Sequence, residues 1–123
     1  MIQIVLPWPP SINNYWRSYR GRVVISAKGR AWLKEAEIAL LEQRIPRDRI
    51  SHKLSVSIDQ FPPDRRRRDI DNPYKVAGDL LVKAGVIEDD SLIYSLSMQR
   101  FDPEPPGKFV IRIKPYEMQD LRV

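Results

Sequence analysis

The sequence predicts an α+β fold in one domain that spans residues 1–123. Two segments carry apolar residues at helical spacing, several short segments alternate apolar and polar residues as strands do, and no repeat or low-complexity linker interrupts them. A chain of 123 residues can bury a modest core but is too short for two full domains. The predicted order is β-β-α-β-α-β-β, which favours a mixed or mostly antiparallel sheet with its two helices on one face.

The N-terminal half is predicted to hold two strands and one helix. Met1–Leu6 is rich in β-branched residues and stops at a proline, so it predicts the first strand. Residues 7–16 contain three prolines, which remove amide donors and predict an irregular loop. Val23–Ile25 predicts a second, short strand. Ser26 is a good N-cap for a helix that runs from about Ala27 to Arg44.

The aromatic residues of the proline loop leave two interpretations open. Trp8, Tyr15 and Trp16 could stack on nucleic-acid bases, or they could pack beneath the loop and anchor it, which is the commoner use of such side chains. A basic cluster around a predicted turn follows, made of Arg17, Arg20, Gly21 and Arg22.

The C-terminal half is predicted to hold three strands and the second helix. Residues 54–59 alternate apolar and polar side chains, as a half-buried strand does, and the prolines at 62 and 63 end it. Asn72-Pro73 is a helix start signal, and the helix should run from Pro73 to about Ala84. Residues 92–98 and 109–114 predict two further strands, which we expect to pair antiparallel across a proline-rich turn.

The composition narrows the chemistry that this chain can perform. It has no cysteine and a single histidine, His52, so disulfides, thiolate zinc sites and cysteine nucleophiles are excluded. Any catalysis must use carboxylates, lysine, tyrosine and water. The formal charge of +5 favours an anionic partner. No apolar run is long enough to span a bilayer and no signal-peptide pattern is present, so a cytoplasmic location is expected.

The most informative stretch runs from Asp64 to Lys75. It contains four adjacent cations, Arg65 to Arg68, whose mutual repulsion a polyanion would relieve. Asp69 and Asp71 follow at a spacing that places both side chains on one side of an extended backbone. Two such carboxylates suit Mg²⁺, which commonly binds one or two protein carboxylates together with substrate phosphate oxygens. The alternative is a solvated loop whose arginine and aspartate neighbours form weak surface ion pairs.

Two later features bear on this site. Lys75 lies four residues after Asp71 and can overhang the same side, whereas Asp79 and Lys83 are explained by a surface ladder of helical ion pairs. The acidic segment Glu88–Asp90 could supply a third carboxylate to a metal, or it could be a solvated acidic turn, although three adjacent acids favour a nearby cation.

In these residues the sequence resembles the RusA family of Holliday junction resolvases, small endonucleases of bacteria and their phages. The resemblance covers most of the chain, and its strongest part is Asp64–Asn72 with the residues after it. The matching positions are Leu6–Ser11, Asn13-Asn14, Arg20-Gly21-Arg22, Ser26, Gly29, Asp64–Asn72, Lys75, Asp79, Leu81, Gly85 and Asp89-Asp90. Pro73 departs from the family's pattern, and the bias against helical angles before proline predicts a slightly later helix start.

The resemblance implies a magnesium-dependent homodimer that binds four-way DNA junctions by shape and nicks two strands symmetrically. It implies Asp69, Asp71 and Asp90 as catalytic, metal-binding acids, with Asp89 a less certain ligand. Lys75 would be a catalytic base or a phosphate-stabilising cation. The predicted DNA contacts are Arg20, Arg22, Arg65, Arg66, Arg67, Arg68 and Asn72. The remaining alternatives are a magnesium-dependent flap or fork nuclease and a basic DNA-binding module without catalysis.

Overall fold

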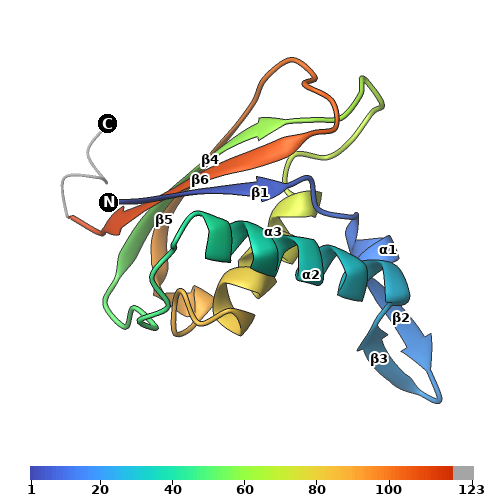
Figure 1. Ribbon diagram of the computed structural model, residues 1–123, viewed down its shortest axis with the longest axis horizontal. Coiled ribbons are helices and arrows are strands. Elements are labelled where there is room, and N and C mark those ends of the chain that lie inside the picture. Colours follow the sequence, from blue (N-terminus) through green and yellow to red (C-terminus); the bar gives the residue numbers. More distant parts are fainter. Residues whose placement is uncertain (118–123) are drawn as a thin grey trace.

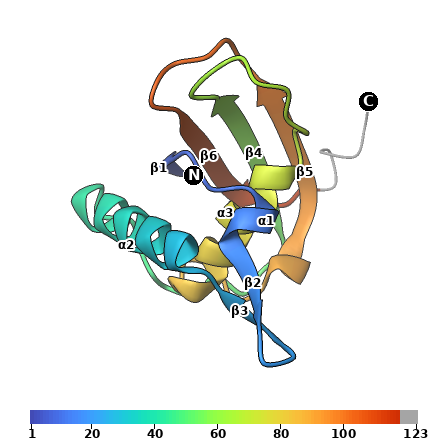
Figure 2. The same ribbon diagram turned by 90° about the vertical axis from the view of Figure 1, so that its right-hand side faces the viewer.

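In the computed structural model, which describes residues 1–117, two long helices cover one face of a four-stranded sheet and a separate hairpin projects from the body (Figures 1 and 2). The elements in chain order are β1 (Ile2–Pro7), α1 (Ile12–Tyr15), β2 (Trp16–Tyr19), β3 (Arg22–Ile25), α2 (Ala27–Glu42), β4 (Leu54–Phe61), α3 (Asn72–Lys83), the 3₁₀ helix η1 (Asp90–Leu92), β5 (Ile93–Arg100) and β6 (Lys108–Pro115). The predicted α+β class and element order are confirmed, and the structure adds α1, β2 and η1.

The sheet is mixed, with the strand order β1-β6-β4-β5. β6 runs antiparallel to both β1 and β4, whereas β5 runs parallel to β4. The expected antiparallel pair of the last two strands is therefore wrong. The chain leaves β4, passes through α3 and returns in the original direction, so β5 joins β4 as a parallel neighbour. The last strand then enters between β4 and β1.

The proline loop contains one turn of helix that its composition did not predict. Ser11 starts α1, because its carbonyl accepts hydrogen bonds from the amides of Asn14 and Tyr15 at 3.0 and 2.9 Å and its hydroxyl caps the turn. Directly after α1, β2 pairs with β3 through a tight turn at Arg20 and Gly21, both of which have positive φ. Figure 2 shows this hairpin extending away from the sheet.

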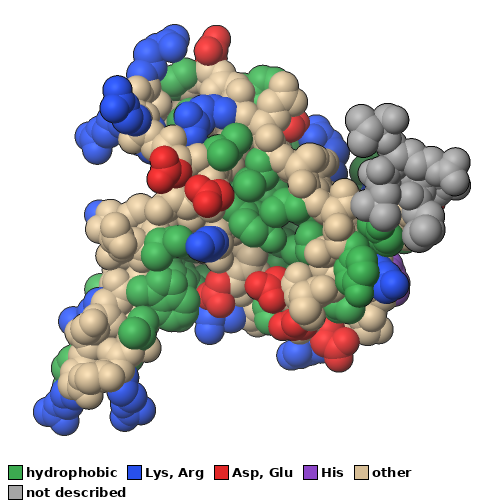
Figure 3. Space-filling model, turned by 180° about the vertical axis from the view of Figure 1, so that it is seen from behind, with side chains coloured by type: hydrophobic (Ala, Val, Ile, Leu, Met, Phe, Trp, Pro, Cys, Tyr) green, Lys and Arg blue, Asp and Glu red, His purple; other side chains and the backbone are tan. Residues whose placement is uncertain are grey.

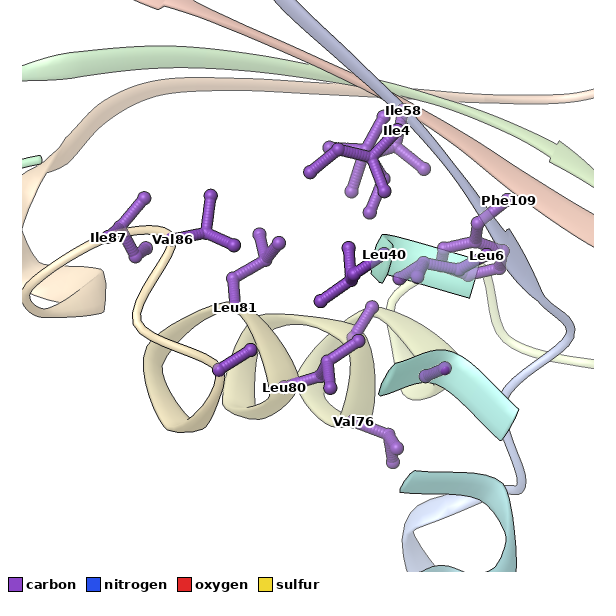
Figure 4. Close-up of a cluster of buried hydrophobic side chains, with 14 of the residues drawn as sticks. Ile4, Leu6, Leu40, Ile58, Val76, Leu80, Leu81, Val86, Ile87 and Phe109 are labelled. Atoms are coloured by element: carbon purple, nitrogen blue, oxygen red, sulfur yellow. The ribbon is translucent and has the colours of Figure 1, made fainter. Parts of the chain in front are cut away.

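The core lies between the sheet and the two long helices. Figure 4 shows side chains of β1, β4 and β6, among them Ile4, Ile58 and Phe109, facing Leu40 of α2 and Leu80 of α3. Period-two alternation along the strands and helical periodicity in α2 and α3 supply these two apolar surfaces. No helix of residues 1–117 is long and apolar enough to cross a membrane.

The aromatic residues of the proline loop pack in the body of the protein. Trp8 lies edge-to-face against Phe109 at a centroid distance of 5.1 Å, and Trp16 packs edge-to-face on Tyr15 at 4.9 Å. Tyr15 is fully buried. Gly29 of α2 makes this possible, because a Cβ there would lie 2.8 Å from the carbonyl oxygen of Tyr15. The anchoring interpretation of these aromatics is therefore confirmed for Tyr15.

α3 begins at Asn72, so the delayed start expected from Pro73 is wrong. The proline falls in the first turn, where its missing amide has no helical partner to lose. Asp71 occupies the N-cap position, but its side chain makes no capping hydrogen bond. Its carboxylate is exposed at the start of the helix and remains available for another partner. Gly85, with φ of 76°, ends the helix as expected.

Candidate active site

The segment that carries Asp69 and Asp71 is fixed through its backbone. The side chain of Gln60 on β4 is fully buried, and its Nε2 donates a 2.7 Å hydrogen bond to the carbonyl of Ile70. Nη2 of Arg100 on β5 donates a 2.6 Å hydrogen bond to the carbonyl of Arg68. Main-chain groups on both sides of Asp69 are thus held by the sheet, while the carboxylates of both acids are exposed.

The arginine run lies in the loop between β4 and α3, and Asp64 partly neutralises it. Nη2 of Arg68 lies 2.8 Å from Oδ1 of Asp64, and Nε of Arg66 lies 3.6 Å from Oδ2. The pKa of Asp64 is lowered chiefly by the hydrogen bond from the Arg66 amide, and the Arg68 guanidinium adds to this. Arg65 and Arg67 are exposed and form no ion pair with any of residues 1–117.

A hollow of about 260 Å³ adjoins this loop. It brings Asp69 together with Arg67 and Arg68, beside Trp8 and Asn72. The guanidinium of Arg68 lies 5.7 Å from the centre of the Trp8 ring, which fixes its position over the aromatic face. Oδ1 of Asn72 accepts a 3.0 Å hydrogen bond from the amide of Ile12, so this side chain ties α3 to α1.

A second hollow, of about 520 Å³, lies along α3. It is lined by Trp16, Tyr74, Lys75, Gly78, Asp79, Val82, Asp89 and Asp90. Lys75 is exposed and forms no ion pair with the described part of the chain. The pKa of Tyr74 is raised by burial and, to a smaller extent, by the negative charge of Asp90. The fold therefore brings Lys75 and Asp90 to one concave surface, although they are 15 positions apart in the sequence.

The two adjacent acids of this hollow differ in their partners. Oδ2 of Asp89 accepts a 3.2 Å hydrogen bond from the amide of Ser91 and a second bond from its hydroxyl, and these bonds cap η1. Both bonds lower the pKa of Asp89, the hydroxyl contributing most. Asp90 is exposed and its side chain makes no such capping bond. This difference favours Asp90 over Asp89 as the acid that is free to bind a ligand.

The helical spacing predicts a surface ladder of ion pairs for Asp79, but its side chain lines this hollow. It is half-buried, and its Oδ2 accepts a 2.6 Å hydrogen bond from the hydroxyl of Tyr15. Tyr15 comes from α1, 64 residues earlier. The spacing of Asp79 from Lys75, four residues on a helix, was the only signal in the sequence for their proximity.

The acids offer the oxygen ligands that hard divalent cations such as Mg²⁺ prefer. Asp69 and Asp90 line different hollows. Within residues 1–117, no group of three or more His, Cys, Asp or Glu side chains is arranged so that it could hold a metal ion. Any cation bound to one or two of these carboxylates must therefore complete its coordination with water or with ligand oxygens.

Basic side chains gather at two ends of one face of the molecule. Figure 3 shows them at the tip of the β2–β3 hairpin and on the loop after β4, with acidic side chains between the two groups. Arg20 lies in the turn of the hairpin and Arg22 directly follows it; both are exposed, and the guanidinium of Arg20 lies 5.3 Å from the centre of the Tyr19 ring. A polyanion that contacts both ends of this face must cross the acidic region.

The chain is similar to known proteins over most of its length. The family model described as endodeoxyribonuclease RusA matches residues 7–114. A crossover junction endodeoxyribonuclease RusA of Shigella sonnei is 36% identical over 110 residues, which are 89% of this chain and 91% of that protein. The proteins of the same name from Escherichia coli K12 and Enterobacteria phage 82 are each 34% identical over the same shares of both chains.

Proposed function

We propose, on the premise that this chain belongs to the RusA family of endodeoxyribonucleases, that it is a Holliday junction resolvase which cuts phosphodiester bonds of four-way DNA junctions. The observation that carries the proposal is the segment from Asp64 to Lys75. It presents the exposed carboxylates of Asp69 and Asp71 beside the guanidinium groups of Arg65 and Arg67, which form no ion pair within residues 1–117. Cations that hold a phosphate backbone next to acids that hold a metal are what a nuclease requires.

DNA would be held mainly through its phosphates. Arg65 to Arg68 on the loop and Arg20 and Arg22 on the hairpin form the two basic ends of one face, so the strand between them passes the acids. Such contacts position the backbone without reading sequence. Binding should therefore weaken steeply with salt, because each neutralised phosphate releases counterions. Asn72 would contribute less than the arginines, since its carbonyl oxygen already ties α3 to α1.

We assign Mg²⁺ to the carboxylates of Asp69 and Asp71, with water and scissile phosphate oxygens as its other ligands. Asp90 lines the other hollow, and residues 1–117 hold no three acids within reach of one metal ion, so Asp90 would join this ion only when bound DNA draws the two surfaces together. A bound Mg²⁺ would supply positive charge at the phosphate and lower the pKa of a coordinated water. Asp69 and Asp71 can present their oxygens because neither is engaged in an ion pair within residues 1–117. Lys75 would place its ammonium group near the phosphate oxygens as charge develops, or orient the attacking water.

A homodimer suits this reaction. A four-way junction has approximate two-fold symmetry, and a C2 dimer presents two equivalent sites, one for each strand to be cut. Because the proposed substrate is DNA, we also propose a cytoplasmic location.

The test is cleavage of labelled synthetic DNA by the purified protein. A four-way junction, a fork, a flap and a linear duplex of matched length are compared with Mg²⁺ and with EDTA. The proposal predicts paired nicks in the junction that require Mg²⁺. Preferred cutting of flaps or forks would assign the protein to that class of nuclease, and junction binding without cleavage would assign it to DNA-binding modules. Sedimentation equilibrium of the purified protein measures its molecular mass in solution and so tests the proposed dimer.

A further inference from the structure

The bond between Tyr15 and Asp79 joins the N-terminal loop to the concave surface along α3. Tyr15 is fully buried, so its hydroxyl needs an internal acceptor. Its partner is a carboxylate at 2.6 Å, and burial together with this negative acceptor raises the pKa of the Tyr15 hydroxyl, which keeps it protonated as a donor. The acceptor is thus fixed at one oxygen, Oδ2.

The fold does not require the acceptor at position 79 to be a carboxylate. A buried tyrosine hydroxyl is satisfied by any oxygen acceptor, including an amide oxygen. An acid instead brings a charge that must be half desolvated, since Asp79 is only partly exposed and makes no ion pair with the described residues. The choice of a charged acceptor points to a role for the charge itself.

The group best placed to respond to this charge is Lys75. Residues four apart on a helix are neighbours, and Lys75 and Asp79 both line the hollow of about 520 Å³. Trp16 and Val82 line it as well, and their apolar surfaces strengthen interactions between charges. A lysine placed before its acidic partner is the less favourable order for stabilising a helix, so helix stability does not explain the pair.

We propose that Asp79 is a positioning residue for Lys75, with the Tyr15 hydroxyl fixing one oxygen of the carboxylate and leaving Oδ1 to draw the lysine ammonium over the hollow. The inference rests on the nuclease function proposed above and adds two residues to it. A free lysine side chain samples many rotamers, and a fixed anion one helical turn away restricts them to those that direct the ammonium into the hollow. Asp89, Asp90 and Tyr74 are the other ionisable groups that line it.

Asp79→Asn separates the charge from the fold. The amide oxygen still accepts the Tyr15 hydrogen bond, so the fold persists while the charge is lost. We expect the single-turnover cleavage rate to fall roughly 10- to 100-fold, as misplaced catalytic groups typically cause, with junction affinity unchanged. Tyr15→Phe keeps the ring and releases the carboxylate, and it should lower the rate less. Asp79→Glu should recover part of the lost rate.

A double-mutant cycle identifies the group through which Asp79 acts. In a Lys75→Ala background, Asp79→Asn should cause no further loss. In a Lys83→Ala background its full effect should remain, because Lys83 is also four residues from Asp79 but does not line the hollow. The proposal would be overturned if Asp79→Asn cut at the wild-type rate. It would also be overturned if the Lys75→Ala, Asp79→Asn double variant lost cleavage by the product of the two single-variant factors.

A second readout does not depend on cleavage. NMR relaxation of the Lys75 side-chain methylene groups reports how far its rotamers are restricted, and this order should fall in Asp79→Asn. The side-chain order of Lys34, on α2, is the control and should not change. Unchanged Lys75 order would contradict the proposal even if the wild-type protein cut no junction, and reduced order would support it in that case. The two proposals can therefore fail separately.

Discussion

The fully buried amide of Gln60 donates a 2.7 Å hydrogen bond to the carbonyl of Ile70, the residue between Asp69 and Asp71. A side chain at the end of β4 thus fixes the backbone of the segment that carries both acids. Oε1 of Gln60 is buried and has no hydrogen-bond partner within the described structure. Gln60 therefore costs free energy through one atom while it holds the segment through the other.

Gln60→Leu should slow cleavage without unfolding the protein. The lost hydrogen bond and the removed unpaired oxygen offset each other, so the unfolding free energy should change by less than about 1 kcal/mol. The freed segment should lower the cleavage rate by roughly tenfold or more through misplaced acids. Urea unfolding and single-turnover assays measure the two effects, with Gln99→Leu on the exposed face of β5 as control. A large stability loss with a normal rate would refute this role.

Arg65 and Arg67, which form no ion pair in the described part of the chain, should contribute to affinity rather than to turnover. Arg65→Ala and Arg67→Ala should each weaken junction binding and reduce the slope of log K against log salt by about one, because each removes one phosphate contact. Cleavage at saturating DNA should change little. Fluorescence anisotropy at several salt concentrations measures this. Arg47→Ala is the matched control, since Arg47 pairs with Glu37 on α2. An unchanged slope in both variants would exclude them from the DNA interface.

Two lysines of α3 provide a matched comparison. Lys75→Ala should retain junction binding and lose cleavage by roughly 100-fold or more, since general acid–base or charge-stabilising groups contribute on that order. Lys83→Ala removes the same charge two turns further along the helix, outside the hollow, and should cut normally. Equal rates for the two variants would refute the role of Lys75.

Much of the fold followed from local signals. Ser26 and Asn72-Pro73 mark the starts of α2 and α3 because caps and helix-compatible prolines act over a few residues. The prediction that the last two strands pair with each other was wrong, because strand pairing depends on contacts across the whole chain. The order β4-α3-β5 carried the signal for a parallel pair, since antiparallel neighbours need no intervening helix.

The candidate site was predictable only where its residues are adjacent in sequence. The arginine run with Asp69 and Asp71 is one continuous segment, so its charges could be read directly. The place of Asp79 in the site could not be predicted, because its partner, Tyr15, lies 64 residues away and the sequence predicts only stacking or packing for that tyrosine. The role of Gln60 could not be predicted either, because a glutamine within an alternating strand gives no sign that its amide will bind another segment.

Acid should destabilise the wild-type protein more than an Asp64→Asn variant. The pKa of Asp64 in the folded protein lies below its ordinary value of 3.8, so in that range the unfolded chain binds more protons and stability rises with pH. The contribution of Asp64 to the free energy of unfolding is complete above pH 3.8. It is lost as the pH falls through the pKa of Asp64 in the folded protein. Urea unfolding from roughly pH 5 to pH 2 measures it. If the free energy of unfolding changed with pH equally in the two proteins, the lowered pKa of Asp64 would be contradicted.

The proposed reaction depends on a divalent cation that Asp69 and Asp71 bind, that Asp90 joins once DNA is bound, and that DNA phosphates share. The most direct measurement is an anomalous difference map from crystals grown with Mn²⁺, which replaces Mg²⁺ at oxygen sites. We expect a peak within about 2.3 Å of carboxylate oxygens of Asp69 and Asp71, and no peak there in Asp69→Asn. Occupied Mn²⁺ positions elsewhere, with none at these carboxylates in a protein that cuts junctions, would contradict this expectation.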